Sequence, residues 1–248
     1  MLLLDAGNVV FGGDKVSRTV RGAALIDGMN LLGYQAMNLA GEDAGWGLDV
    51  ARQRAAEAQF PMISANVVVS GTQQPLFEPY TVIQVDGVPI AILGLADTEV
   101  PREYRRPLPS GEVLDYLDPI ETTRKHLPEM QKRADIIIVL SHLGFEADVR
   151  LAKGVEGIDV ILGGLSRKWE GVPYTPPGTQ TVISQAGYRG EWIGRLDLQF
   201  DAEGRITAQK GGPVPLEAQY TDDPDMATLL LRWADRAQQA QATRSPGK

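Results

Sequence analysis

The sequence contains no cysteine and only two histidines among its 248 residues. The absence of cysteine excludes thiolate metal sites and a cysteine nucleophile, because both need a thiolate sulfur. It leaves the compartment open, since a chain without thiols is compatible with oxidising and reducing surroundings alike. No apolar run approaches the roughly 20 residues that cross a bilayer, so we expect no membrane span. The opening residues 1–4 are too short for a signal peptide.

The chain also lacks an excess of positive charge. Its 24 Lys and Arg residues are outnumbered by 32 Asp and Glu residues, which gives a formal net charge of -8 at pH 7. Sequence-independent binding to nucleic acid needs a basic face, so we expect no nucleic-acid partner. The composition is that of an ordinary globular protein, and the length allows one large domain. We assign residues 1–220 to this domain and residues 221–248 to a C-terminal helix with a disordered tail.

Apolar runs of strand length alternate with helical patterns along the chain. Strands are expected at residues 1–4, 36–39, 61–69, 135–140, 158–162, 180–185 and 192–200. Asp86-Gly87 lies between two further segments, 80–85 and 88–95, and indicates a β-hairpin. Helices are expected at residues 20–32, ending at Gly33, and at 48–58, 119–133, 148–154 and 224–240. This alternation predicts a layered α/β fold with a mixed sheet or two stacked sheets, and with helices outside.

Four loops that follow predicted strands are candidates for a functional site. They are residues 5–8, 41–43, 141–142 and 163–167. In α/β folds, such loops gather at one edge of the sheet and form the cleft. The last loop carries Leu165, Ser166 and Arg167, none of which is a good metal ligand or proton shuttle. The sequence therefore predicts a cleft in which the loop of residues 163–167 offers no good metal ligand and no good proton shuttle.

Five segments of the chain carry a resemblance to a known family. They are LLLDAGNVVFG, LLGYQAMNLAGEDAGWG, FPMISANVV, DIIIVLSHLGFEADVRLAKGVEGIDVILGG and TVISQAGYRGEWIGRLDLQFD, in that order. Together they resemble the metallophosphoesterase superfamily, and more closely the catalytic domain of bacterial 5'-nucleotidases and UDP-sugar hydrolases. The resemblance implies a four-layer α/β/β/α sandwich with mixed sheets and a phosphoric monoester hydrolase that uses two metal ions. It also implies a periplasmic or other extracytoplasmic location.

The resemblance implies which positions would serve the metal site, and six residues of this chain occupy them: Asn8, Glu42, Asp43, His142, Leu165 and Arg167. We call these six residues the vestigial cleft, because only His142 keeps the family's residue type. Asn8 stands at the bridging aspartate, and its amide offers one neutral oxygen where two close cations need anionic oxygens. Leu165 and Arg167 stand at a pair of histidines; the first donates nothing and the second places a permanent positive charge there. We therefore assign no catalytic residue and no metal ligand.

Two alternatives for the vestigial cleft stay open. Glu42 and Asp43 could form an oxygen-only site with Asn8 for Ca²⁺ or Mg²⁺, or a single divalent cation could bind near Glu42, Asp43 and His142. Otherwise the two acids cap or solvate their loop. His142 could equally be a loop imidazole bonded to backbone or water, since metal sites need several converging ligands.

The last expectation concerns the first strand and the role of the chain. In the family, a strand bearing an Asp-x-His motif precedes LLLDAG, so residues 2–4 are expected to border a vacant position of their sheet. The sheet then closes by rearrangement, an upstream segment was omitted, or a partner supplies a strand. Our interpretation is a binding or structural subunit of a larger assembly, with a protein partner or an oligomer and no cofactor. The alternative is a divergent metal-dependent nucleotide or phosphate-ester hydrolase.

Overall fold

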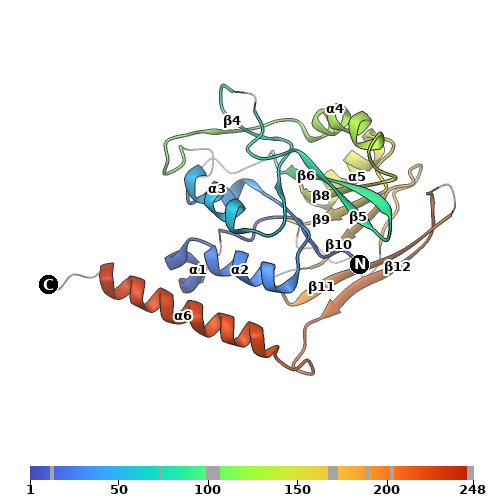
Figure 1. Ribbon diagram of the computed structural model, residues 1–248. Coiled ribbons are helices and arrows are strands. Elements are labelled where there is room, and N and C mark those ends of the chain that lie inside the picture. The colour runs from blue at the N-terminus through green and yellow to red at the C-terminus, as the bar shows by residue number, and fades with distance from the viewer. Residues whose placement is uncertain are drawn as a thin grey trace.

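Two mainly parallel sheets organise the chain (Figure 1). The computed structural model describes residues 1–11, 14–72, 74–98, 107–166, 173–187, 190–201 and 204–244. The first sheet has the parallel order β1-β2-β3, with β1 at Leu4–Asp5, β2 at Ala36–Asn38 and β3 at Met62–Ile63. The second has the order β10-β9-β8-β6-β5, and only β5 is antiparallel to its neighbour. Its strands are β5 (Tyr80–Val85), β6 (Val88–Ala96), β8 (Ile136–His142), β9 (Val160–Gly163) and β10 (Val182–Gln185).

Two antiparallel strand pairs and a set of helices surround these sheets. The pairs are β4 (Val67–Val69) with β7 (Leu114–Tyr116), and β11 (Trp192–Phe200) with β12 (Ile206–Pro215). The helices are α1 (Lys15–Val20), α2 (Ala23–Leu32), α3 (Leu48–Glu57), α4 (Pro119–Gln131), α5 (Phe145–Gly154) and α6 (Pro224–Arg244), with a 3-10 turn at Gly41–Ala44. The helix α6 lies along α1 and α2 (Figure 1). None of the helices within the described residues has both the length and the apolar character needed to cross a bilayer.

Three hydrophobic clusters lie between four layers, which are two sheets and the helices that cover their outer faces. In the first cluster, Leu127 of α4 and Leu151 of α5 pack on the outer face of the five-stranded sheet. In the second, Ile26 of α2 and Leu48 of α3 pack on the outer face of the three-stranded sheet. The third cluster lies between the two sheets and joins Ala36 and Ile63 to the inner faces of β6 and β8. Burial of apolar area in all three clusters stabilises an α/β/β/α sandwich, so the fold class expected from the resemblance is confirmed.

The two sheets approach closely where β6 crosses β2 and β3. A Cβ atom at Gly94 would lie 2.6 Å from Oδ1 of Asn38 and 2.9 Å from the carbonyl oxygen of Ile63. The same Asn38 donates from Nδ2 to the carbonyl oxygens of Leu95, at 2.8 Å, and Ala6, at 2.9 Å. A single buried amide therefore ties the loop after β1 to strand β6 of the other sheet.

Local sequence signals predicted several elements correctly. Asp86 and Gly87 both have positive φ, at 52° and 86°, which the two-residue turn between β5 and β6 requires. Gly33 ends α2 in the left-handed conformation, and its N–H donates to the carbonyl oxygens of Asn30 and Met29. The hairpin and the helix end were therefore readable from the turn residues alone.

Other expectations were wrong. The helix predicted at residues 20–32 is broken by Arg21 and Gly22, whose φ angles of 50° and 79° separate α1 from α2. The strand predicted at residues 61–69 is two short strands, β3 and β4, which belong to different sheets. Strands β7 and β12 were not predicted. Helix α6 ends at Arg244, four residues beyond the predicted end at residue 240, and residues 245–248 lie outside the described residues.

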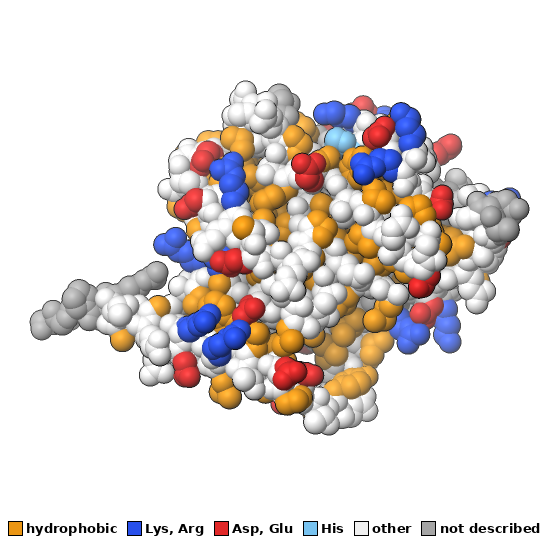
Figure 2. Space-filling model, viewed as in Figure 1, with side chains coloured by type: hydrophobic (Ala, Val, Ile, Leu, Met, Phe, Trp, Pro, Cys, Tyr) orange, Lys and Arg blue, Asp and Glu red, His pale blue; other side chains and the backbone are white. Residues whose placement is uncertain are grey.

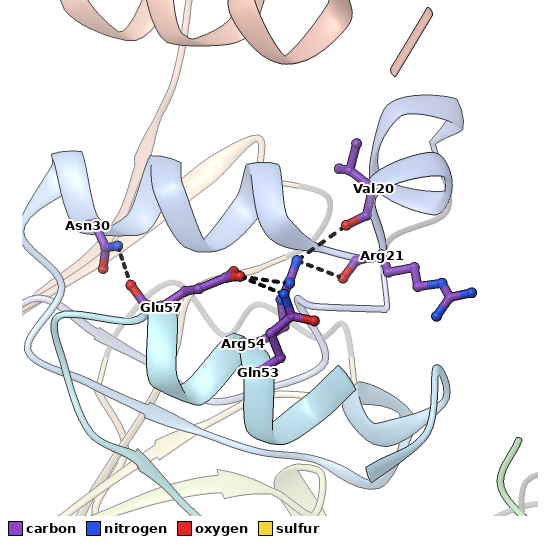
Figure 3. Close-up of polar contacts among 6 residues, drawn as sticks. All are labelled: Val20, Arg21, Asn30, Gln53, Arg54 and Glu57. Carbon is purple, nitrogen blue, oxygen red and sulfur yellow. Dashed lines mark hydrogen bonds and ion pairs between the residues drawn. The ribbon is translucent and has the colours of Figure 1, made fainter. Parts of the chain in front are cut away.

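A buried arginine holds the break between α1 and α2 (Figure 3). Arg54 of α3 is 4% exposed, and its guanidinium points at the end of α1. Nη1 donates to the carbonyl oxygens of Val20, at 3.3 Å, and Arg21, at 3.4 Å, while Nη2 contacts Oε1 of Glu57 at 2.9 Å. The last carbonyls of a helix have no partner within the helix, so Arg54 supplies their donors from a neighbouring element.

Candidate functional site

The loops that follow the parallel strands meet at one edge of the sandwich. A Cβ atom at Gly164, after β9, would lie 3.1 Å from Nδ1 of His142 at the end of β8 and 3.6 Å from Cβ of Ala6 after β1. The N–H of Asn8, in the same loop as Ala6, donates to Oδ2 of Asp43 at 2.7 Å. The loops after β1, β2, β8 and β9 therefore come together, as the strand order predicts.

Asp43 organises the loop that carries Asn8. Its buried carboxylate accepts backbone N–H bonds from Asn8 and Val10, both at 2.7 Å, and from Ala40 at 3.0 Å. Burial raises the pKa of Asp43 to about 6, although these three hydrogen bonds act to lower it. Three of the roughly four acceptor positions of the carboxylate are thus occupied by backbone donors. Asn8 itself is exposed and has the left-handed φ of 66°.

His142 and Leu165 belong to the loops after β8 and β9 at the same edge. His142 ends β8 beside Ala96 of β6, and its Nδ1 atom is buried without a hydrogen-bond partner among the described residues. Burial lowers the pKa of His142, and the nearby charge of Asp97 acts in the opposite direction, so the imidazole is neutral at pH 7. Leu165 is 41% exposed and has a φ of 69°, which is unusual for a bulky side chain. Arg167 lies outside the described residues.

One acidic residue of the site was missed by the sequence analysis. Asp5 ends β1, and its Oδ1 accepts the N–H of Gly7 at 2.7 Å. Burial, with a smaller contribution from the negative charge of Asp43, raises the pKa of Asp5 to about 7 against the lowering effect of the Gly7 N–H. The signal was present in the sequence, because an aspartate directly follows the apolar run Leu2–Leu4. The two carboxylates give this end of the cleft a negative potential when both are ionised.

A second polar group adjoins His142 and includes Asp148 and Gln185, which the sequence analysis did not single out. Ser141, Asp148, Gln185 and Ser166 form a continuous hydrogen-bonded network that joins β8, α5, β10 and the loop after β9. No spacing rule connects these four positions, which are spread over 45 residues of sequence. Their proximity follows only from the parallel order β10-β9-β8.

The donor set does not fit a pair of close metal ions. Within the described ranges, no three His, Asp or Glu side chains converge on a point that would hold a metal ion. Asn8 offers a neutral oxygen, Leu165 offers none, and Asp43 is engaged with backbone N–H groups. The side chain best able to accept a further partner is His142, through Nδ1. Glu42, in the 3-10 turn, is half-buried beside Asp43.

Sequence comparison finds relatives among phosphoesterases and nucleotidases. A scan against models of protein families finds no match. The trifunctional nucleotide phosphoesterase YfkN of Bacillus subtilis is 30% identical over 265 residues, which cover 90% of this chain and 18% of that protein. Human 5'-nucleotidase is 28% identical over 255 residues, which cover 94% of this chain and 44% of that protein. The chain thus spans less than half the length of these relatives.

A solved structure extends the likeness to three dimensions. The crystal structure of a 5'-nucleotidase precursor from Thermus thermophilus superposes with a TM-score of 0.84 at 30% sequence identity, and the match covers 96% of this chain and 50% of that one. The fold and the sequence similarity agree, so the chain has the fold of the metallophosphoesterase superfamily. More narrowly, it is a metallophosphoesterase domain of the 5'-nucleotidase-like type, and the resemblance seen in the sequence is confirmed.

Proposed function

We propose that this 5'-nucleotidase-like domain no longer carries out two-metal hydrolysis and acts as a binding or structural subunit of a larger, extracytoplasmic assembly. The observation that carries the proposal is the commitment of the Asp43 carboxylate to three backbone N–H groups. Asn8 and Leu165 supply no anionic oxygen or imidazole beside it, so charge compensation for two cations is missing. The extracytoplasmic location is supported by relatives that include a snake venom 5'-nucleotidase.

The competing proposal is a divergent metal-dependent nucleotide or phosphate-ester hydrolase. It is supported by the names of the relatives, which are nucleotidases and phosphoesterases. It is also supported by Nδ1 of His142 at the cleft edge, which has no hydrogen-bond partner among the described residues and is available as a metal ligand. In this case a single divalent cation would bind near Glu42, Asp43 and His142.

Metal content and hydrolysis distinguish the two proposals. After purification in Mn²⁺ and Zn²⁺, we expect less than one equivalent of metal per chain by mass spectrometry. We also expect no nucleotide hydrolysis above that of a His142→Ala variant, because too few ligands converge. Two equivalents of metal together with hydrolysis that His142→Ala removes would overturn the non-catalytic proposal. One equivalent lost in His142→Ala would support the single-cation alternative.

The partner is proposed to bind at the edge of β1. Among the described residues β1 pairs only with β2, so its other edge is open. Leu2 and Leu4 are half-buried against the cluster between the sheets, to which Leu196 and Leu198 of β11 also belong. Figure 2 shows apolar side chains gathered on the face where Figure 1 places the N-terminus and β11. An open apolar strand edge favours pairing with an extended segment of another chain.

Amide hydrogen exchange tests the proposed pairing. For residues 1–248 expressed alone, we expect fast exchange at Leu2 and Leu4 and a tendency to self-associate, because an unpaired edge exposes its backbone N–H groups to water. The N–H of Gln35, which donates to Leu3 within the fold, is the internal reference for slow exchange. A soluble monomer with slow exchange at both leucines would rule out a strand-donating partner.

A further inference from the structure

In the hydrogen-bonded network of Ser141, Asp148, Gln185 and Ser166, each bond has a fixed donor and a fixed acceptor. One branch starts at the N–H of Phe145, which donates to Oγ of Ser166 at 3.3 Å; Ser166 donates to Oε1 of Gln185 at 2.8 Å, and Nε2 of Gln185 donates to Oδ2 of Asp148 at 3.3 Å. The other starts at the N–H of Leu143, which donates to Oγ of Ser141 at 3.2 Å. Ser141 in turn donates to Oδ1 of Asp148.

Both branches therefore end on the carboxylate of Asp148. A backbone N–H can only donate, and an ionised carboxylate can only accept. The two ends of each branch thus dictate the orientation of every hydroxyl and amide between them. A proton on Asp148 would convert one of its oxygens into a donor that faces another donor. The chain of bonds satisfies all its members only when Asp148 is ionised.

The network also spans the loops of the cleft. Ser141 precedes His142, and Ser166 follows Leu165. The N–H of Gly164 donates to the carbonyl oxygen of Ser141 at 2.7 Å, so the two loops are already in contact. The packing at this point is tight, because a Cβ atom at Gly163 would lie 2.8 Å from Nε2 of Gln185 and closer still to Oδ2 of Asp148. A change in the network is therefore transmitted to the loop.

We propose that Asp148 is a proton-controlled latch that fixes the loop of residues 163–166 beside His142 when ionised and releases it when protonated. Protonation turns the side chain of Gln185 around, because its oxygen must then accept from Asp148. Its Nε2 faces Ser166, whose hydroxyl loses its acceptor, and the bond to the N–H of Phe145 is weakened. The latch stands whether or not the cleft hydrolyses phosphate esters.

The surroundings of Asp148 indicate that its carboxylate takes up a proton near neutral pH. Asp148 is 0% exposed, and burial raises its pKa to about 7 against the lowering effect of Ser141 and Gln185. Its side-chain partners on β8 and β10 are neutral. The charged residues Glu146, Arg150 and Lys153 of its own helix α5 are exposed, and Asp159 lies at the far end of β9. Arg167 lies outside the described residues.

Nuclear magnetic resonance of the backbone amides in the full chain tests the latch. We expect the N–H signals of Leu143 and Phe145, the two starting donors, to titrate with one shared midpoint near pH 7. Below that midpoint the amide of Phe145 should exchange about tenfold faster after correction for the intrinsic rate, since one hydrogen bond is weakened. The amide of Gly33, at a distant helix end, serves as a reference for global change.

Two variants separate the branches. Asp148→Asn carries a permanent donor, so it should show the low-pH signals at all pH values and no titration. Ser166→Ala should abolish the titration at Phe145 and leave it intact at Leu143, because only one branch is cut. If Asp148→Asn does not fold, Ser141→Ala provides the complementary cut. Wild-type signals that do not titrate, or a titration at Phe145 that survives in Ser166→Ala, would overturn the proposal.

Discussion

Replacing Arg54 by alanine is expected to lower the free energy of unfolding by about 2–3 kcal/mol, because a buried side chain is removed and two carbonyl oxygens lose their donors. The guanidinium is buried between α3 and the end of α1, and it donates to two carbonyl oxygens and to Glu57 (Figure 3). Without it, the carbonyls of Val20 and Arg21 lose their side-chain donors, and a cavity remains between the helices. Each of these effects destabilises the folded chain.

Two further variants divide this cost into its parts. Arg54→Lys keeps the charge but replaces the planar fork with a single ammonium, which cannot reach both carbonyls and Glu57 at once; we expect most of the loss to remain. Glu57→Gln should cost less than about 1 kcal/mol, because its side chain is 41% exposed and the amide oxygen can still accept. Urea unfolding of the three variants measures the series. An Arg54→Ala variant as stable as Glu57→Gln would show that Arg54 does not hold the α1–α2 break.

The chain is also expected to be more stable at pH 6 than at pH 8, by about 2 kcal/mol. Burial raises the pKa of Asp5 and of Asp148 to about 7 and that of Asp43 to about 6. In the unfolded chain these groups ionise at about pH 4. Between these values the folded chain holds more protons than the unfolded chain, so stability falls as the pH rises through this window and then levels off above pH 7.

The two histidines limit the rise in stability that the buried acids produce as the pH falls. Burial lowers the pKa of both His126 and His142. Below about pH 6.5 the unfolded chain therefore takes up protons that the folded chain does not, and stability falls as the pH falls. The opposite signs of the buried acids and the histidines place the maximum stability near pH 6.

Urea unfolding at pH 6 and pH 8 measures this dependence. The Asp148→Asn variant should lose about half of the difference between the two pH values, because Asp5 still titrates in the same range. Glu156→Gln, a change of an exposed acid in the turn after α5, should keep the full difference. A wild-type chain that is more stable at pH 8 would show that these carboxylates are ionised in the folded state throughout.

The candidate site was only partly predictable. The loops could be placed from the apolar strands before them, and the structure brings Asn8, Asp43, His142 and Leu165 to one edge as expected. The role of Asp43 could not be predicted, since its three hydrogen-bond donors belong to residues 8, 10 and 40. The same holds for Asp148, whose burial depends on β8 and β10. A carboxylate in a sequence gives no sign of whether it will face water or backbone N–H groups.

The sequence by itself determined the elements whose signals are local. Continuous apolar runs form the buried parallel strands β8 and β9, because such strands are covered on both faces. Asp86-Gly87 forms the turn between β5 and β6, and Gly33 ends α2, because both need positive φ. The order of these elements was enough to predict the layered α/β fold and the edge at which its loops meet.

Only the tertiary structure decided where local patterns are interrupted. The break at Arg21 is held by Arg54, 33 residues later in the chain, and Gly22 is required because a Cβ atom there would lie 2.6 Å from Cγ1 of Val10. The run at residues 61–69 splits into two strands because the side chain of Asn66, between them, bonds to the backbone N–H and carbonyl of Ala96. These contacts join residues that are distant in sequence, and their free energy exceeds the small differences in local propensity that favour a continuous helix or strand.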